Sequence, residues 1–312
     1  MVRANLGARV AVAGLLAAFA ALLAAPGARG AGAGGTAPVV SVPITTSVLE
    51  LTDHSRLARP LHGRPVPRRL VTILRYPGSP GAPGPRPLIV FAHGFANTPA
   101  TYRRLLGAWA QAGFVVAAPV FPLLNPAAPG GPDESDLINE PGDISFVISQ
   151  LLADSAAPTG ALHGLIDPTR IAVAGQSDGA IAALAVADAR RFRDPRIRAA
   201  VILSGAEMSG IGGYQFGPAG PALLAVQGTA DTSNEPRYTY AYFRAAARPK
   251  YLLRLPGAQH LPPYTYEQPQ LGIVERLSTA FLETYLGVAP SDLAELPALG
   301  DRPGLAELVA EL

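Results

Sequence analysis

Residues 171–179 read I-A-V-A-G-Q-S-D-G, and this stretch predicts the fold of the chain. It opens on a short apolar run, typical of a buried strand, and residues 180–189 are small and helix-favouring. Strand, tight turn and helix form the context that a nucleophile elbow, G-x-S-x-G, requires. A Cβ at Gly175 or Gly179 would clash where the turn brings backbone against backbone. We therefore expect Ser177 at the apex with its hydroxyl exposed; the alternative is an ordinary turn with a solvated serine.

The composition sets limits on the organisation and chemistry of the chain. It has 312 residues, 49% of them hydrophobic, which is ample for one large core. It contains no cysteine, and this excludes disulfides, thiolate metal sites and a cysteine nucleophile. We expect a flexible leader over residues 31–44, a single catalytic domain over 45–290 and a tail over 291–312 with modest helical character.

The N-terminus has the pattern of a secretory signal peptide over residues 1–30. Arg3 and Arg9 flank its start, and residues 10–25 are an uncharged run, shorter than the ~20 residues of a membrane span. A passable cleavage site, A-R-G, follows at residues 28–30. We expect a secreted protein without a stable membrane span; the alternative is an uncleaved anchor. Beyond residue 30 the chain has 22 basic and 23 acidic residues and no basic patch, which argues against a nucleic-acid partner.

Short apolar segments alternate with helical ones along the chain. Strands are predicted at residues 47–51, 70–76, 87–92, 114–118, 171–174, 199–203, 222–227 and 250–255, the first two antiparallel. Helices are predicted at residues 101–111, 144–151 (capped by Asp143), 180–189, 237–247 and 273–286. The alternation indicates an α/β protein whose mostly parallel central sheet carries helices on both faces. The Pro/Gly/Asp-rich residues 119–141 predict a long loop, usually functional or mobile.

Parallel sheets bind ligands at the carboxyl ends of their strands, where the reactive residue types gather. A serine needs a base, and histidine suits that task. Of the five histidines, His260 alone follows the last predicted strand. Asp231 follows the strand before it and is the best carboxylate to orient the imidazole, with Glu235 as a nearby rival. The order Ser177, Asp231, His260 is that of an α/β-hydrolase.

The other candidate site residues surround Ser177. Backbone N–H groups of Phe95 and Asp178 are the expected oxyanion donors. Candidates for the substrate pocket are His93, which better suits a loop-stabilising role than catalysis, and also Gln176 and Leu261.

The side chain of Asp178 raises a difficulty. At about 6.5 Å and an effective dielectric of about 20, its charge would oppose the oxyanion by roughly 2.5 kcal/mol. We expect the carboxylate to turn into solvent or pair with an arginine, rather than stay protonated, and to disfavour anionic substrates.

Six motifs carry a resemblance to a known family. They are R-Y-P at residues 75–77, L-I-V-F-A-H-G-F at 88–95, G-F-V-V-A-A-P at 113–119, D-P-T-R-I-A-V-A-G-Q-S-D-G at 167–179, Q-G-T-A-D-T at 227–232 and P-G-A-Q-H at 256–260. Over residues 45–287 the chain resembles the serine-dependent, dienelactone-hydrolase-like branch of the α/β-hydrolases. That branch includes the platelet-activating-factor acetylhydrolase, chlorophyllase and cutinase-like bacterial polyester hydrolase families. The resemblance implies a secreted carboxylic ester hydrolase without cofactor or metal.

Several positions depart from these relatives. Gln176 stands where many carry His, and Asp178 where polyester hydrolases typically have Met. Residues 204–210, S-G-A-E-M-S-G, lack the substrate-stacking tryptophan of polyester hydrolases, and Trp109 is the only tryptophan in the chain. Aromatic polyester should therefore be a poor substrate. True dienelactone hydrolases use cysteine, so that activity is not implied.

These features favour a serine esterase that acts through an acyl-enzyme on Ser177. A peptidase or a lipid or polyester hydrolase on the same fold is the alternative enzyme, and a non-catalytic secreted binding protein is the alternative outside enzymes. We expect a monomer whose substrate is a small-molecule, lipid or polymer ester. The motifs leave the acyl chain and the alcohol part open.

Overall fold

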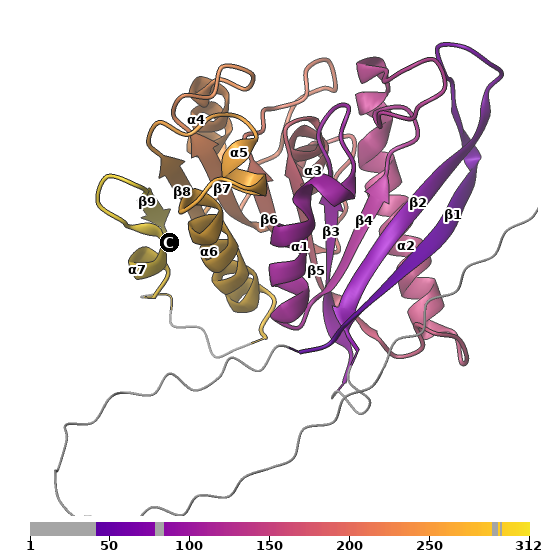
Figure 1. The fold of residues 1–312 in the computed structure, drawn as a ribbon, viewed down its shortest axis with the longest axis horizontal. Helices are drawn as coiled ribbons and strands as arrows, with labels where there is room; N and C mark the ends of the chain where they lie inside the picture. The colour runs from indigo at the N-terminus through magenta and orange to yellow at the C-terminus, as the bar shows by residue number, and fades with distance from the viewer. Residues whose placement is uncertain (1–41, 79–83, 289–292, 294) are drawn as a thin grey trace, which may run out of the picture. The chain divides into compact units, whose positions relative to one another are not determined.

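The computed structural model describes residues 42–78, 84–288, 293 and 295–312. The predicted signal peptide, and the predicted leader up to residue 41, lie outside these ranges. Within them, nine strands form one sheet in the order β1-β2-β4-β3-β5-β6-β7-β8-β9 (Figure 1). Strands β3 to β8 are mutually parallel wherever they pair, and β1, β2 and β9 pair antiparallel. The predicted α/β-hydrolase fold with a mostly parallel sheet is confirmed.

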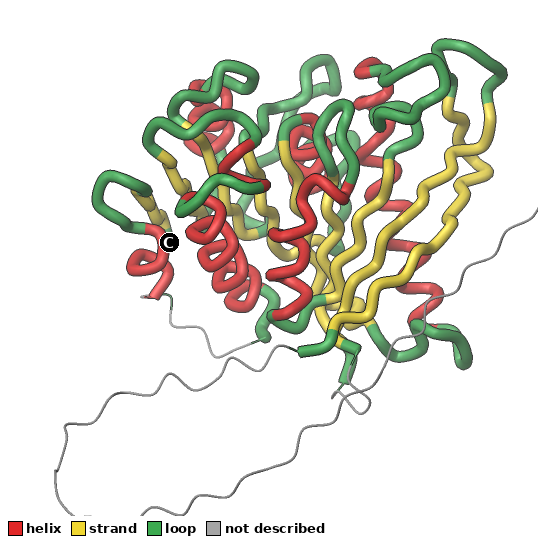
Figure 2. The backbone as a smooth tube through the Cα atoms, in the orientation of Figure 1, coloured by secondary structure: helices red, strands yellow, loops and turns green. Residues whose placement is uncertain are grey.

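The strands are those predicted, with longer bounds and one addition. They are β1 (Ile44–Ala58), β2 (Val66–Pro77), β3 (Arg86–Ala92), β4 (Val115–Val120), β5 (Ile166–Gln176), β6 (Ile197–Leu203), β7 (Ala222–Gly228), β8 (Lys250–Leu255) and β9 (Glu307–Glu311). The long β1–β2 hairpin forms one edge of the sheet (Figure 2). Strand β1 is the outermost strand, and β2 lies between β1 and β4; alternate residues of β2, such as Leu70 and Leu74, are fully buried and pack this part of the sheet on the core.

Helices cover both faces of the sheet, and each face has its own core (Figure 1). The helices are η1 (Pro99–Tyr102), α1 (Arg103–Gln111), η2 (Glu134–Asn139), α2 (Glu140–Ala156), α3 (Asp178–Asp188), α4 (Pro236–Ala245), α5 (Pro262–Thr265), α6 (Gln270–Tyr285) and α7 (Glu295–Gly300). Residues of α2, α3 and α4 share one core, and residues of α1, α5, α6 and α7 share the other. The loops after β3, β5, β7 and β8 consequently gather at one edge of the sheet, at the top of Figure 1.

The C-terminal segment differs from the prediction of a tail with modest helical character. Its described part contains α7 and also β9, which pairs antiparallel with β8 and ends the sheet. The strand was missed because only Leu308 among its residues packs against the core. It is held instead by its backbone ladder with β8, beside which Arg254 and Glu307 form an ion pair at 2.8 Å that no local pattern reveals.

The predicted helix cap at Asp143 is wrong. Helix α2 begins at Glu140, and Asp143 lies buried in its first turn, where Arg68 reaches it from β2 at 2.6 Å. The guanidinium of Arg68 also binds Asp136 of η2 at 2.7 Å, so a fully buried arginine joins the hairpin to both helices. Two carboxylates compensate the buried charge, which makes the cluster tolerable. The segment predicted as a long loop is therefore partly helical, and η2 is attached to the hairpin.

Candidate active site

Ser177 sits at the apex of a sharp turn between β5 and α3. Its backbone has φ 57° and ψ −124°, a conformation that costs energy in a residue with a side chain and persists only where its surroundings enforce it. The predicted crowding at both glycines is present. A Cβ at Gly175 would collide with the carbonyl of Gly179, and one at Gly179 would collide with the carbonyl of Ala92. The turn therefore presents the Ser177 hydroxyl above the edge of the sheet.

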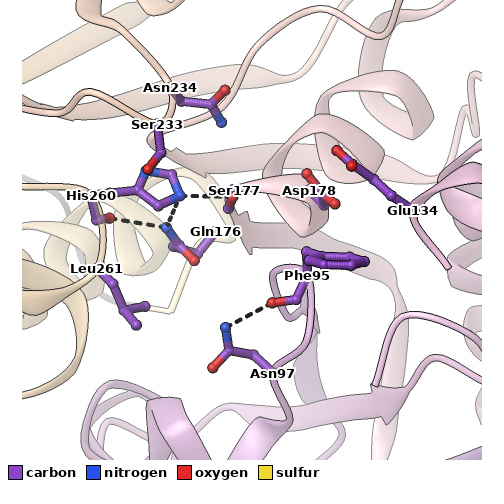
Figure 3. Close-up of a pocket in the computed structure, with 10 residues that line it drawn as sticks. All are labelled: Phe95, Asn97, Glu134, Gln176, Ser177, Asp178, Ser233, Asn234, His260 and Leu261. Atoms are coloured by element: carbon purple, nitrogen blue, oxygen red, sulfur yellow. Dashed lines mark hydrogen bonds between the residues drawn. The ribbon is translucent and has the colours of Figure 1, made fainter. Parts of the chain in front are cut away.

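The structure brings the three predicted catalytic residues into one hydrogen-bonded line. The Ser177 Oγ lies 2.8 Å from His260 Nε2, and His260 Nδ1 lies 2.8 Å from Asp231 Oδ2 (Figure 3 draws the first contact). Gln176 Nε2 also donates toward His260 Nε2, at 3.3 Å. Because Nε2 faces two donors, the proton of a neutral imidazole belongs on Nδ1, facing the carboxylate. This tautomer leaves Nε2 free to accept the serine proton.

Asp231 is held as an anion. It is 3% exposed, and its Oδ1 accepts hydrogen bonds of 2.9 Å from the backbone N–H groups of Ser233 and Asn234. Burial alone would raise the pKa of Asp231, but the hydrogen bond from His260 and the backbone donor outweigh it and lower the pKa below its ordinary value. The rival, Glu235, instead pairs with Arg237 at the surface. The geometry therefore favours Asp231 as the partner of His260.

Two backbone N–H groups flank Ser177 at the positions predicted for oxyanion donors. In the described part of the chain the Phe95 N–H has no hydrogen-bond acceptor. Asp178 is the first residue of α3, where N–H groups have no acceptor within the helix. Both residues line the same pocket as Ser177. This arrangement can receive a developing negative charge next to the serine.

His93 does not line the substrate pocket, contrary to the prediction. It is fully buried, and both ring nitrogens are engaged: Nδ1 donates to the Gly94 carbonyl at 2.9 Å, and Nε2 accepts from the Phe121 N–H at 3.1 Å. Burial lowers the pKa of His93 to about 4, so the ring is neutral. With both nitrogens committed, His93 holds the loop that carries Phe95, as its expected stabilising role requires.

Ser177 opens into a pocket of about 310 Å³. The predicted residues Gln176 and Leu261 line it, together with residues that the sequence did not single out: Asn97, Glu134, Ser233 and Asn234 (Figure 3). These residues come from the loop after β3, η2 and the loop after β7, which are far apart in the sequence. Only the folding of the chain shows that they share one surface.

Gln176 and Tyr102 form a second network that sequence reasoning missed. The Tyr102 hydroxyl donates to Gln176 Oε1 at 2.7 Å and accepts from the Gly94 N–H at 3.3 Å. Gln176 Nε2 then donates to the His260 carbonyl at 3.0 Å. The network links the loop that carries one oxyanion donor to the loop that carries the base. Tyr102 lies in a helical segment whose sequence contains no signal for this contact.

The expectation that Asp178 turns into solvent or pairs with an arginine is wrong. Its side chain is 7% exposed, its Oδ2 is buried without a partner, and no arginine of the described residues pairs with it. Burial, and then the charge of Glu134, raise the pKa of Asp178 to about 6, with His260 acting in the opposite direction. Helices η2 and α2 both pack against α3, which explains why little of this side chain is exposed, although it still lines the pocket. Protonation of a fraction of Asp178 near neutral pH remains as the way to reduce its repulsion of the developing oxyanion.

Residues 42–78, 84–288, 293 and 295–312 contain no group of three or more His, Cys, Asp or Glu side chains that could hold a metal ion. Among the helices that the structure describes, none combines the length and apolar character needed to cross a bilayer.

Comparison with known proteins agrees with the fold. A family model described as Chlorophyllase matches residues 57–203, which contain the Phe95 loop and Ser177, whereas Asp231 and His260 lie beyond the match. A search of the curated proteins finds no match. The family match supports a serine ester hydrolase of the α/β fold in general terms. The fold and this match together place the chain in the α/β-hydrolase superfamily, and over residues 57–203 it is similar to the chlorophyllase family.

Proposed function

We propose that the protein is a serine carboxylic ester hydrolase that acts through an acyl-enzyme on Ser177. The observation that carries this proposal is the hydrogen-bonded line from Ser177 through His260 to Asp231, with both contacts at 2.8 Å, at the edge of a pocket. The strained turn and two backbone donors support it, because a binding protein has no need of either.

The geometry supports acylation by proton transfer through His260. As Ser177 Oγ bonds to the ester carbonyl carbon, its proton passes to His260 Nε2, and Asp231 stabilises the resulting imidazolium. The carbonyl electrons move onto oxygen, which accepts hydrogen bonds from the N–H groups of Phe95 and Asp178. The carbon–oxygen bond to the alcohol then breaks, and the alcohol leaves with the proton from His260. A water molecule repeats the sequence on the acyl-enzyme and releases the acid.

The pocket favours soluble short-chain esters over aromatic polyester. Ser177 is partly exposed at a pocket of about 310 Å³, which is accessible to a small acyl group. Trp109 is fully buried in α1 and its Nε1 donates to Ser278 at 2.9 Å, so it is not available to stack on an aromatic polymer. Release of aromatic monomers from polyester film at a rate near that on soluble esters would contradict this part of the proposal.

A labelling experiment followed by a substrate panel tests the proposal. A fluorophosphonate probe should modify the wild-type protein at Ser177 and leave Ser177→Ala unlabelled. The panel then compares aryl esters of increasing acyl length with peptide amides of matched structure. We expect ester hydrolysis without comparable amide hydrolysis. Absence of labelling would favour a non-catalytic binding protein, and preferred cleavage of the amides would favour a peptidase.

We also propose that residues 1–30 act as a secretory signal peptide, which the charge and hydropathy pattern of those residues supports. The measurement is the N-terminal sequence of the protein recovered from the medium of an expressing bacterial culture. A mature N-terminus near residue 31 is expected. Retention in the membrane fraction with Met1 intact would favour the uncleaved anchor.

A further inference from the structure

The pocket beside Ser177 is lined by acidic side chains that no lysine or arginine of its described lining balances. Two carboxyl groups line it, those of Asp178 and Glu134, and among the described residues that line it none is lysine or arginine. Glu134 is exposed at the start of η2, and no ion pair of the described chain includes it. A pocket built in this way repels anions and attracts cations.

Asp178 differs from an ordinary surface carboxylate because it is buried. It is 7% exposed, and its buried Oδ2 has no hydrogen-bond partner within the described chain. Figure 3 shows its carboxyl between Ser177 and Glu134, among the side chains that line the pocket. Burying a carboxyl group without a partner is unfavourable, so a positive charge bound in the pocket would stabilise the ionised form of Asp178.

Phe95 adds the second element that a cation site needs. Its ring is 38% exposed at the same pocket, on the loop that places its N–H next to Ser177. An aromatic face attracts cations, and it suits quaternary ammonium groups, which have no N–H to donate. Carboxylates and an exposed ring together recognise such a group by charge and contact.

We propose that the pocket selects esters that carry a positively charged group, such as a quaternary ammonium, within a few bonds of the ester carbonyl. The cation would lie against Phe95 between Asp178 and Glu134 while Ser177 attacks. This inference rests on the proposed ester hydrolysis and adds the substrate class.

The preference should depend on pH through Asp178. The groups that face it are Glu134 from η2, Glu140 from α2, Tyr102 from η1 and His260 from the loop after β8. Because the pKa of Asp178 is raised to about 6, its negative charge is present above that pH and is lost below it. Preference for a cationic ester should therefore fall as the pH drops through about 6.

The test measures kcat/KM on isosteric ester pairs at low salt. One pair is the acetate ester of choline and the acetate ester of 3,3-dimethylbutanol, in which a tert-butyl group replaces trimethylammonium. The other pair carries the same exchange in the acyl part of an ethyl ester. Taking the ratio within each pair cancels the effects of pH on the catalytic steps that are common to both esters. At pH 8 we expect a ratio of about ten or more in favour of the cation in at least one pair, decreasing at high salt.

Three variants locate the effect. Asp178→Asn should lower the ratio about tenfold and remove its change near pH 6, and Glu134→Gln, at an exposed position, should lower it about threefold. Asp154→Asn, which removes an exposed charge from the far part of α2, should leave the ratio unchanged. A wild-type ratio of one or less in both pairs, or a ratio insensitive to both Asp178→Asn and Glu134→Gln, would overturn the inference. Hydrolysis of the neutral esters in that case would leave the proposed function intact, whereas no hydrolysis of any ester would contradict the function itself.

Discussion

Two carboxyl groups lie near Ser177, and their environments are opposite. Asp231, after β7, accepts hydrogen bonds from His260 and from two backbone N–H groups, and its pKa is lowered. Asp178, in the first turn of α3, is also buried, but its Oδ2 has no partner in the described chain and its pKa is raised to about 6. Burial raises the pKa of both groups, and the hydrogen-bond donors that reach Asp231 but not Asp178 Oδ2 account for the opposite outcomes.

This difference suggests a division of roles across the site. Enzymes often separate the tasks of paired carboxyl groups by driving their pKa values apart. A permanently ionised Asp231 suits the orientation of His260 and the stabilisation of its charged form. An Asp178 that titrates near neutral pH suits the binding of a charged substrate.

Removing the side chain of either Ser177 or His260 should abolish nearly all hydrolysis. Ser177→Ala and His260→Ala should each lower kcat by roughly 10⁴–10⁶-fold, because the two residues act as one unit. For the same reason the double variant should be hardly worse than either single one. Steady-state kinetics on a soluble aryl ester provides the measurement. Losses that multiply in the double variant would indicate that the two residues act independently.

Asp231→Asn should cost roughly 10³–10⁴-fold in kcat, because an amide favours the wrong imidazole tautomer. Glu235→Gln is the matched control, since Glu235 directly precedes α4 at the surface and, among the described residues, forms an ion pair with Arg237 alone. It should change kcat less than twofold. If Glu235→Gln lost activity while Asp231→Asn kept it, the assignment of the acid would be reversed.

Gln176→Leu should reduce kcat by about 10- to 100-fold, because misplacing a reacting group by about 1 Å has an effect of this size. The substitution removes the donor to the His260 carbonyl and leaves the Tyr102 hydroxyl without its acceptor. KM should change little, since positioning of the base matters in the transition state. A large rise in KM with unchanged kcat would show that Gln176 binds substrate instead of positioning His260.

Glu140, like Asp178, is a buried carboxyl group without a hydrogen-bond partner in the described chain, and its substitution should have the smallest of these effects. It is fully buried, neither carboxyl oxygen has a partner in the described chain, and burial followed by repulsion from Asp143 and Asp178 raises its pKa. A raised folded pKa contributes stability at low pH that is lost as the pH rises above the unfolded value. Glu140→Gln should therefore raise the Tm by about 2 °C or more at pH 8 and by less at pH 5.

Asp154→Asn on the same helix is the control for this stability prediction, because its side chain is exposed. Its Tm should follow the wild type at both pH values. A Tm of Glu140→Gln that fell equally at both pH values would show that the carboxyl group has a stabilising contact in the protein.

Much of the fold followed from local patterns. Apolar runs of strand length alternating with helical segments predicted the parallel sheet, and the G-x-S-x-G turn predicted the elbow. The order of Ser177, Asp231 and His260, each placed after a strand, predicted which side chains would meet, because parallel strands end at a common edge. These are properties of short segments and of their order, and a sequence displays both directly.

The tertiary structure alone decided the charge and the shape of the site. Glu134 reaches the pocket because Arg68, distant in sequence, binds η2 and α2 to the hairpin, and His93 is withdrawn from it by contacts with Gly94 and Phe121. The pKa of Asp178 depends on which elements bury it and on whether a hydrogen-bond donor reaches its carboxyl group. A sequence lists which groups can ionise, but their pKa values depend on burial and on neighbours in space, and only the packed structure supplies those.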